Sequence, residues 1–370
     1  MSVAEIIKNK LPEIISLREK LSLNAELSCK EFKTQKILLD FMSELQLKTS
    51  ALYNTGVCAL LNPDESEGEQ CIALRADMDA LPVNGVSHAC GHDYHMAIIA
   101  GTALVLRELG YKSCVKFIFQ PAEEDEGGAL PMIKEGVLEN PKVIEIIGLH
   151  VWPELKVGKI SVGAGASMAS VDDFHVTFKG IGGHAAMPEA FINPIYPAIE
   201  FIENIKTHNE DSLISVACIN SGSVPNVISQ EAIVKGTVRT FKAKLRKILK
   251  EKIIHFASRT AKKHGCEVEI YYNSQYPPLI NDEKLTEEFI ESSKSILGKE
   301  NVLQLIRTFA AEDFSFFAEN VPATHFRLGI ADDEKGLSPL HSPLFNVNDD
   351  ALFYGIYVIT NFIINRTKKD

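Results

Sequence analysis

Three short apolar runs do most to restrict the folds available to this chain of 370 residues. They occupy residues 71–74, 115–119 and 143–147, they are rich in β-branched or aromatic residues, and a helical pattern separates each from the next. Such alternation favours parallel strands joined by helical crossovers. Because ligands of open α/β sheets bind at the carboxyl ends of the strands, the residues after each run are the first candidates for function.

Charged or coordinating side chains follow all three runs. Asp77 and Asp79 follow the first, Glu123 and Glu124 the second, and His150 the third. Paired carboxylates usually belong to a solvated loop, and a lone histidine is usually a satisfied polar residue. The second run, however, is expected to be buried on both faces, so its two carboxylates would leave the sheet at the ligand-binding edge. One could then face a metal and the other a water, as metal-assisted hydrolysis requires.

The densest motif is HACGHDYH at residues 88–95. In an extended chain His88, Cys90 and His92 would share a face. If the chain instead turns helical after the glycine, His92 and His95 would be neighbours. Imidazole and thiolate ligands suit a borderline-soft divalent cation such as zinc, so the motif indicates a metal site. The alternative is a buried cysteine beside histidines that form local hydrogen bonds.

A different pattern begins near residue 170. It predicts, in order, a strand at 172–179, a helix at 197–206, strands at 213–220 and 232–241, a helix at 243–264 and a strand at 267–272. This is the order of a ferredoxin-like α+β unit. We therefore predict an α/β catalytic domain with a central mixed, mostly parallel sheet, residues 1–170 and 281–370. An inserted ferredoxin-like α+β domain, residues 171–280, would interrupt it.

The composition excludes several classes of function. Lys and Arg number 38 against 49 Asp and Glu, and the resulting net charge of −11 argues against nucleic acid or an anionic membrane as a partner. The first 20 residues lack the apolar core and the cleavage site of a signal peptide. No stretch has the roughly 18–20 apolar residues of a membrane span. The cysteines are dispersed rather than arranged as a disulfide framework. These features are typical of a cytoplasmic protein.

Eight short strings follow one another along nearly the whole chain. They are LRADMDALP at 74–82, HACGHD at 88–93, FQPAEE at 119–124, GLHVWP at 148–153, GGHAA at 182–186, GTVRTF at 236–241, AEDF at 311–314 and LHSPLF at 340–345. In this order they resemble the dinuclear-metal amidohydrolase family of aminoacylases, hippurate hydrolases and indole-acetyl-amino-acid hydrolases, relatives of the metallo-carboxypeptidases. The resemblance implies a metallo-exopeptidase-like catalytic domain.

The resemblance also implies roles for residues of the catalytic domain. Cys90 would bridge two divalent metal ions, and the remaining ligands would be His92, Glu124, His150 and His341. Glu123 would be the general base that takes a proton from a metal-bound water and later passes it to the leaving amine. Asp79 would support the metal site from outside the ligand set. The metals would be zinc or manganese, with nickel or cobalt as alternatives.

Three residues of the inserted domain receive roles in the same way. His184 would stabilise the oxyanion, reaching an active site across a homodimer that forms through the inserted domain. Asn226 and Arg239 would hold the substrate carboxylate, for which a forked guanidinium is well suited.

The sequence departs from the family pattern at two places. Residues 83–87 stand where relatives usually carry a loop of about 20 residues. Residues 22–26, SLNAE, lack the histidine and the proline of the family's His-x-x-Pro-Glu. Neither change removes an expected ligand, but both bear on which substrate would fit.

The leading hypothesis is a metal-dependent amidohydrolase. It would cleave N-acyl amino acids, of N-acetyl or N-benzoyl type, into a carboxylic acid and a free amino acid. One alternative is a dipeptidase or carboxypeptidase with the same two metals. Other classes are a non-catalytic binding module on the same fold and a protein with a closed structural zinc site. The expected partners are a small-molecule substrate and a second copy of the chain, without nucleic acid or membrane.

Overall fold

The computed structural model describes residues 1–63 and 69–367, and the chain divides into two compact units. The first comprises Met1–Ser167, Ile280–Ile306 and Phe316–Asp370, and the second comprises Met168–Leu279 and Arg307–Ser315. The segment 307–315 lies outside the range of 171–280 expected for the inserted domain. It joins the second unit because Ala169 N–H donates to Ala310 O at 2.9 Å and the Arg239 guanidinium donates to Phe309 O at 2.8 Å.

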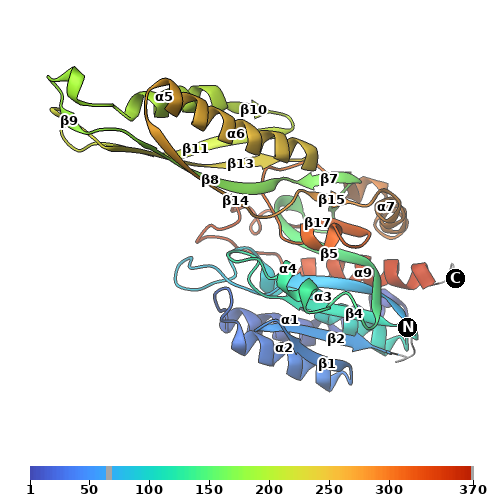
Figure 1. The fold of residues 1–370 in the computed structure, drawn as a ribbon. Coiled ribbons are helices and arrows are strands. Elements are labelled where there is room, and N and C mark those ends of the chain that lie inside the picture. Colours follow the sequence, from blue (N-terminus) through green and yellow to red (C-terminus); the bar gives the residue numbers. More distant parts are fainter. Residues whose placement is uncertain (64–68, 368–370) are drawn as a thin grey trace. The chain divides into compact units, whose positions relative to one another are not determined.

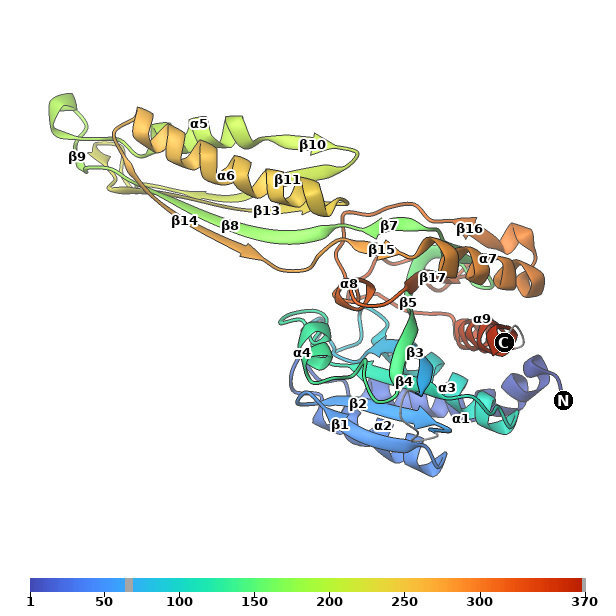
Figure 2. The same ribbon diagram turned by 45° about the vertical axis from the view of Figure 1, so that its right-hand side comes forward.

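An eight-stranded sheet forms the centre of the first unit (Figures 1 and 2). Its strands, in spatial order, are β1 (Lys48–Leu52), β2 (Gly56–Leu61), β4 (Val115–Gln120), β3 (Gln70–Asp77), β5 (Lys142–Lys156), β17 (Ala323–Ala331), β6 (Ile160–Val162) and β16 (Val302–Gln304). The four central strands β4, β3, β5 and β17 are parallel to their neighbours within this group, whereas β1, β2 and β6 add antiparallel pairs. The predicted mixed, mostly parallel sheet is confirmed.

The prediction that His150 follows the end of the third strand is wrong, because β5 continues to Lys156. On one side the ladder with β3 stops at the pair Arg75–Gly148, while on the other side β17 continues to pair, with Arg327 opposite His150. His150 therefore lies inside a strand, two residues past the last pair between β5 and β3. The carboxyl edge of β3 and the middle of β5 meet at the same place.

Helices cover the sheet and enclose the apolar core of the first unit. They are α1 (Val3–Leu23), α2 (Phe32–Glu44), α3 (His92–Glu108), α4 (Ala129–Lys134), α7 (Glu283–Leu297), α8 (Ser315–Ala318) and α9 (Asp350–Thr367), with a 3₁₀ turn η2 (Lys299–Asn301). Helices α1, α3 and α9 pack against one another, and α3 and α9 also contact central strands. Every residue of α3 from His92 to Leu106 is buried, so this helix is part of the core and its first turn is held rigidly.

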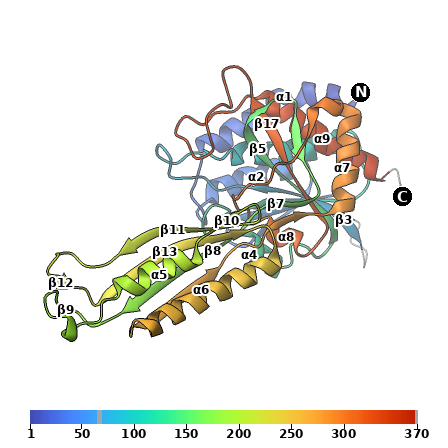
Figure 3. The same ribbon diagram turned by 90° about the horizontal axis from the view of Figure 1, so that it is seen from above.

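The second unit contains a five-stranded antiparallel sheet with the order β10-β11-β13-β8-β14. Along the chain the elements are β8 (Ser170–Lys179), α5 (Ile195–Ile205), β10 (Thr207–Asn209), β11 (Ser212–Asn220), β13 (Glu231–Thr240), α6 (Ala243–Lys263) and β14 (Glu267–Ser274). Without the edge strand β10 this is the expected strand–helix–strand–strand–helix–strand order. Figure 3 shows α5 and α6 side by side on one face of the sheet, where they bury the inward residues of β8 and β13.

Short elements complete the fold. β9 (Gly183–His184) pairs with β12 (Val227–Ile228) next to the 3₁₀ turn η1 (Pro188–Ala190), and β7 (Gly165–Met168) pairs with β15 (Leu279–Asn281). Among the described residues, no helix combines the length and the apolar character needed to span a bilayer.

Phe201 of α5 tests how the second unit is stabilised. Its fully buried ring contacts the rings of Phe174 and Phe178, with centroid distances of 6.2 and 5.7 Å. Phe201→Ala should lower the free energy of unfolding by about 3–5 kcal/mol, because a buried aromatic side chain is replaced by a cavity. Ile199→Ala, at a 51% exposed position of the same helix, is the matched control and should change it by less than about 1 kcal/mol. Urea unfolding followed by circular dichroism measures both, and equal effects would contradict this packing.

Candidate metal centre

Gly91 determines where α3 begins and how the HACGHDYH motif is arranged. It is the N-cap residue and has a φ of +83°, a left-handed conformation that favours glycine. A Cβ atom at this position would lie 2.3 Å from Cγ2 of Val151, so the close approach of α3 to β5 also requires glycine. The chain is therefore helical from His92 onwards, and the rings of His92 and His95 lie 5.3 Å apart.

Five predicted donor residues from four segments of the first unit nevertheless converge. Cys90 Sγ lies 3.4 Å from His150 Nε2 and 3.2 Å from His341 Nε2. Glu124 Oε1 lies 3.3 Å from His341 Nε2 and 3.7 Å from His92 Nε2. We call Cys90, His92, Glu124, His150 and His341 the donor cluster. Thiol, imidazole and carboxylate groups at these separations are the ligand types that zinc and similar cations take.

The donor cluster contains polar atoms that the protein alone does not satisfy. His92 Nε2 and Glu124 Oε1 are buried and make no hydrogen bond within the described residues. Buried polar atoms without partners are rare and cost free energy, so each calls for a ligand. The other nitrogen of His92 is used, because Nδ1–H donates to the backbone oxygen of Asp79 at 2.9 Å. This leaves Nε2 directed at the cluster, where it would bind a cation in exchange for its proton.

Burial and neighbouring carboxylates shift the pKa values of two residues of the donor cluster. Burial and the adjacent carboxylate of Glu124 raise the pKa of the Cys90 thiol well above its ordinary value. Burial alone would lower the pKa of His92, but the carboxylates of Asp77 and Asp79 raise it to about 10. A buried thiol held protonated beside carboxylates is the situation that divalent cations reverse, since a coordinating thiol loses its proton.

His341 enters the cluster from a strained loop. It has a φ of +63°, and its N–H donates to Ala89 O at 2.9 Å, which ties this loop to the residue before Cys90. Its side chain is half exposed, and the neighbouring carboxylate of Glu124 raises its pKa. His341 thus closes the cluster on its solvent side.

Asp79 holds together the segments that carry the donors. Its Oδ2 accepts hydrogen bonds from the N–H of Glu124 at 2.9 Å and from the hydroxyl of Ser28 at 2.7 Å. Its Oδ1 lies 3.3 Å from His92 Nδ1. Carboxylates behind an imidazole can orient a metal-binding ring, so this placement is compatible with the supporting role of Asp79, which stays a prediction.

His95 belongs to a separate buried network that sequence reasoning missed. Its Nδ1–H donates to Asp77 Oδ1 at 2.6 Å, and its Nε2 accepts the N–H of Val151 at 2.9 Å, so neither nitrogen is free for a cation. Asp77 also accepts from the Arg75 guanidinium at 2.9 Å, and Arg75 donates to Gln120 Oε1 at 2.9 Å. The available signal was the carboxylate of Asp77, which stands after an apolar run that predicts a strand.

His88, the third residue expected in the extended arrangement, is absent from every group of closely spaced donors in the described part of the chain. Burial lowers its pKa to about 3, so the ring is neutral. It lines a cavity of about 360 Å³ together with Ser22, Asn84 and Ser87. The two departures from the family pattern, at residues 22–26 and 83–87, therefore border the same cavity.

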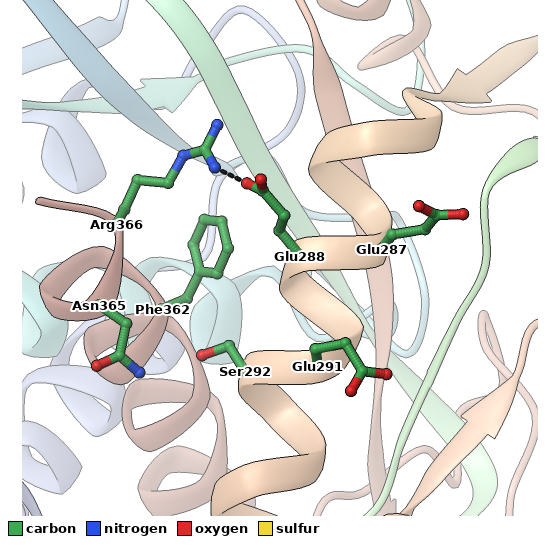
Figure 4. Close-up of a pocket in the computed structure, with 7 residues that line it drawn as sticks. All are labelled: Glu287, Glu288, Glu291, Ser292, Phe362, Asn365 and Arg366. Carbon is green, nitrogen blue, oxygen red and sulfur yellow. Dashed lines mark ion pairs between the residues drawn. The ribbon is translucent and has the colours of Figure 1, made fainter. Parts of the chain in front are cut away.

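A second cavity of the first unit, about 460 Å³, lies between α7 and α9 (Figure 4). Glutamates dominate its lining, and Arg366 forms an ion pair with Glu288. It contains neither cysteine nor histidine. The donor cluster is therefore the better candidate for metal chemistry.

Comparison with known proteins assigns the family. The sequence model described as Peptidase family M20/M25/M40 matches residues 73–365, which include the whole donor cluster. The chain belongs to peptidase family M20/M25/M40. The resemblance inferred from the eight strings is confirmed.

Two relatives of this chain are named as deacetylases of N-acetyl compounds. N-acetyl-L-cysteine deacetylase of Bacillus subtilis is 33% identical over 370 residues, covering 94% of this chain and 86% of that protein. N-acetyldiaminopimelate deacetylase of Halalkalibacterium halodurans is 33% identical over 381 residues, covering 95% and 99%. The crystal structure of Bacillus subtilis YXEP, described as a dinuclear metal-binding M20 peptidase, has a TM-score of 0.83 and 31% identity, covering 97% and 99%. The predicted class, a metal-dependent amidohydrolase, is confirmed.

In this M20 family member the predicted residues of the second unit are not gathered at one point. His184 is exposed on β9, and its Nδ1 accepts the N–H of Ala186 at 3.1 Å. Asn226 is exposed beside it, and its backbone oxygen accepts the N–H of Ala185. Arg239 lies near the far end of β13, about 26 Å along the strand from its first residue. Within one chain, Asn226 and Arg239 cannot bind the same carboxylate group.

The network around Asp77 makes a prediction about stability and pH. Burial opposes its ionisation, but the neighbouring imidazoles and the Arg75 guanidinium hold the pKa of Asp77 well below its usual range. A depressed folded-state pKa stabilises the protein above the unfolded-state pKa of about 3.9, and this stabilisation is lost as the pH falls towards the folded-state value.

We expect Asp77→Asn to lower stability at pH 7 and to flatten the fall in stability below about pH 4. Chemical denaturation of chelator-treated protein between pH 3 and 7 measures this effect. Asp40→Asn, at an exposed position of α2, is the control and should follow the unsubstituted protein. Parallel curves for all three proteins would show that Asp77 does not carry this pH dependence.

Proposed function

We propose that this protein hydrolyses the amide bond of N-acyl amino acids with the help of two divalent metal ions. Cys90 would bridge the ions, and His92, Glu124, His150 and His341 would complete the ligand set. The observation that carries the proposal is the donor cluster, in which His92 Nε2 and Glu124 Oε1 are buried and make no hydrogen bond within the described residues. The deacetylase names of the relatives and the dinuclear description of YXEP support the same reading.

The donor set favours zinc or manganese. One thiol and three imidazoles suit zinc, while a carboxylate also suits manganese, and nickel or cobalt remain alternatives to be compared by reconstitution. When bound, such ions supply a water of lowered pKa and polarise the carbonyl of the amide. The side chains of the protein then have to orient the ions, move the proton and hold the substrate.

Glu123 is the residue best placed to move the proton. It lies three residues past the end of β4, is 9% exposed, and has a carboxylate oxygen within 4.8 Å of ligand atoms of His92 and Glu124. Adjacent residues point in different directions, so Glu124 can act as a ligand while Glu123 faces the water. Glu123 would accept a proton from that water and donate it to the nitrogen of the leaving amino acid.

The residues of the second unit would act on the substrate. His184 Nδ1 accepts a backbone N–H, so in the neutral ring the proton lies on Nε2, where it can be donated to an oxyanion. Because Asn226 lies beside His184 whereas Arg239 lies near the far end of β13, we assign these two candidates for the substrate carboxylate to different substrate molecules of a homodimer. His184 of one chain would act on the substrate bound by its partner.

Metal content tests the ligand set. Protein purified with zinc should hold two ions per chain, and Cys90→Ala should lose at least one, because the proposed bridging ligand is removed. Cys218→Ala removes an exposed cysteine outside the donor cluster and should leave the content unchanged. Inductively coupled plasma mass spectrometry of desalted protein gives the stoichiometry. Two ions in the Cys90→Ala protein would rule out the bridging role.

The role of Glu123 is tested by turnover. With N-acetyl and N-benzoyl amino acids as substrates, Glu123→Ala should keep its metal and lose turnover by about 10²–10⁴-fold, the usual contribution of a general base. Glu126→Ala changes an exposed glutamate of the same loop and should retain activity. Full activity of a folded, metal-loaded Glu123→Ala protein would remove Glu123 from the mechanism. Preferential cleavage of free dipeptides would instead indicate a dipeptidase.

A further inference from the structure

Glu31 is a fully buried carboxylate outside the donor cluster, and the mechanism described above does not use it. Its two oxygens have different partners. Oε2 accepts the hydroxyl hydrogen of Thr55 at 2.6 Å, and Oε1 accepts the N–H of Ala122 at 3.0 Å. Ala122 directly precedes Glu123, so a charged side chain from the start of α2 reaches the loop that carries the proposed general base.

The start of α2 shows that Glu31 is not needed for capping. It is the N-cap residue, yet its side chain makes no capping hydrogen bond. Glu26 performs this task, because its Oε2 accepts the N–H groups of Lys33 at 2.8 Å and of Thr34 at 3.0 Å. Capping by Glu26 leaves the Glu31 side chain available to the loop after β4.

The loop needs an external support because its backbone is strained. Ala122 has a φ of +56°, in the left-handed region that residues other than glycine rarely adopt. Its oxygen accepts the N–H of Gly127 at 2.8 Å, which closes the loop. Strained conformations of this kind persist only where neighbouring groups determine them, and here the Glu31 carboxylate holds the N–H of the strained residue.

Glu123 is thus held from both sides. The N–H of the preceding residue, Ala122, is bound by Glu31, and the N–H of the following residue, Glu124, is bound by Asp79 at 2.9 Å. Two buried carboxylates from different parts of the chain therefore fix the backbone on each side of one residue. The direction of the Glu123 side chain follows from this backbone.

We propose that Glu31 is a positioning residue that aims Glu123 at its proton donor by holding the N–H of Ala122. The inference rests on the proposed function, in which Glu123 is the general base. Burial raises the pKa of Glu31, so its carboxylate is costly to keep in the interior. An apolar residue at position 31 would avoid this free-energy cost. A residue that lowers stability without such a need is typically retained for function.

Three variants separate positioning from stability. Glu31→Ala removes the support and should lower kcat by about 10–100-fold with little change in KM, because small displacements of a catalytic group are costly. Glu31→Gln should stay within about threefold of the unsubstituted protein, since its amide oxygen can accept from Ala122 and its NH₂ can donate to Thr55. Thr55→Val removes the other partner of Glu31 and should leave kcat unchanged.

Hydrogen exchange gives a readout that does not depend on activity. Mass spectrometry of the segment 120–128 should show faster amide exchange in Glu31→Ala than in the unsubstituted protein, with no change in Thr55→Val. If Glu31→Ala does not fold, Glu31→Asp replaces it, because the carboxylate is withdrawn by one methylene group and should change kcat and exchange in the same direction. In a Glu123→Ala background, Glu31→Ala should cause no further loss of kcat.

The proposal is overturned if Glu31→Ala retains kcat, if exchange in 120–128 is unchanged, or if Thr55→Val loses as much kcat as Glu31→Ala. An additive loss in the Glu123→Ala background would equally place the effect of Glu31 elsewhere. If the unsubstituted protein cleaves no N-acyl amino acid, the proposed function fails instead. The exchange measurement still decides whether Glu31 holds the loop.

Discussion

The carboxylate of Asp79 is the contact on which the proposed metal centre depends. Asp79 lies just beyond the end of β3. Its carboxylate faces Nδ1 of His92, the first residue of α3, and accepts the backbone N–H of Glu124, which follows β4. Three segments that are distant in sequence are thereby fixed relative to one another before any ion binds. Since Asp79 is almost completely buried, its negative charge has to be matched by these donors and by the imidazole of His92. This single buried charge therefore helps to position two proposed ligands, His92 and Glu124, and the proposed base Glu123.

Much of the fold could be predicted because its signals are local. Apolar runs marked the central strands, and alternation marked the strands of the second unit, whose order agrees with the structure. The end of β5 was missed because the pairing with β17, a strand about 180 residues later, keeps the chain extended past His150. Likewise, the role of His95 is decided by the N–H of Val151, a long-range partner that no spacing in the motif indicates.

For the donor cluster too, the motifs indicated which residues matter, while only the fold shows which of them are in contact. Residue type and order pointed to Cys90, Glu124 and His150, and the structure brings their side chains together. Glu31 escaped notice because it belongs to none of the motifs and nothing in the residues around it indicates a buried partner. Only the structure shows that Glu26 caps α2 while Glu31 reaches Ala122. Residues that position others are defined by what they contact, so they are the hardest to find in a sequence.

We propose that the donor cluster binds two metal ions. Anomalous diffraction from crystals grown with zinc, collected on both sides of the zinc absorption edge, tests it most directly. Two anomalous peaks are expected about 2.0–2.3 Å from ligand atoms of the cluster, with Cys90 Sγ shared between them. A single peak, or peaks that avoid Cys90, His92, Glu124, His150 and His341, would contradict it.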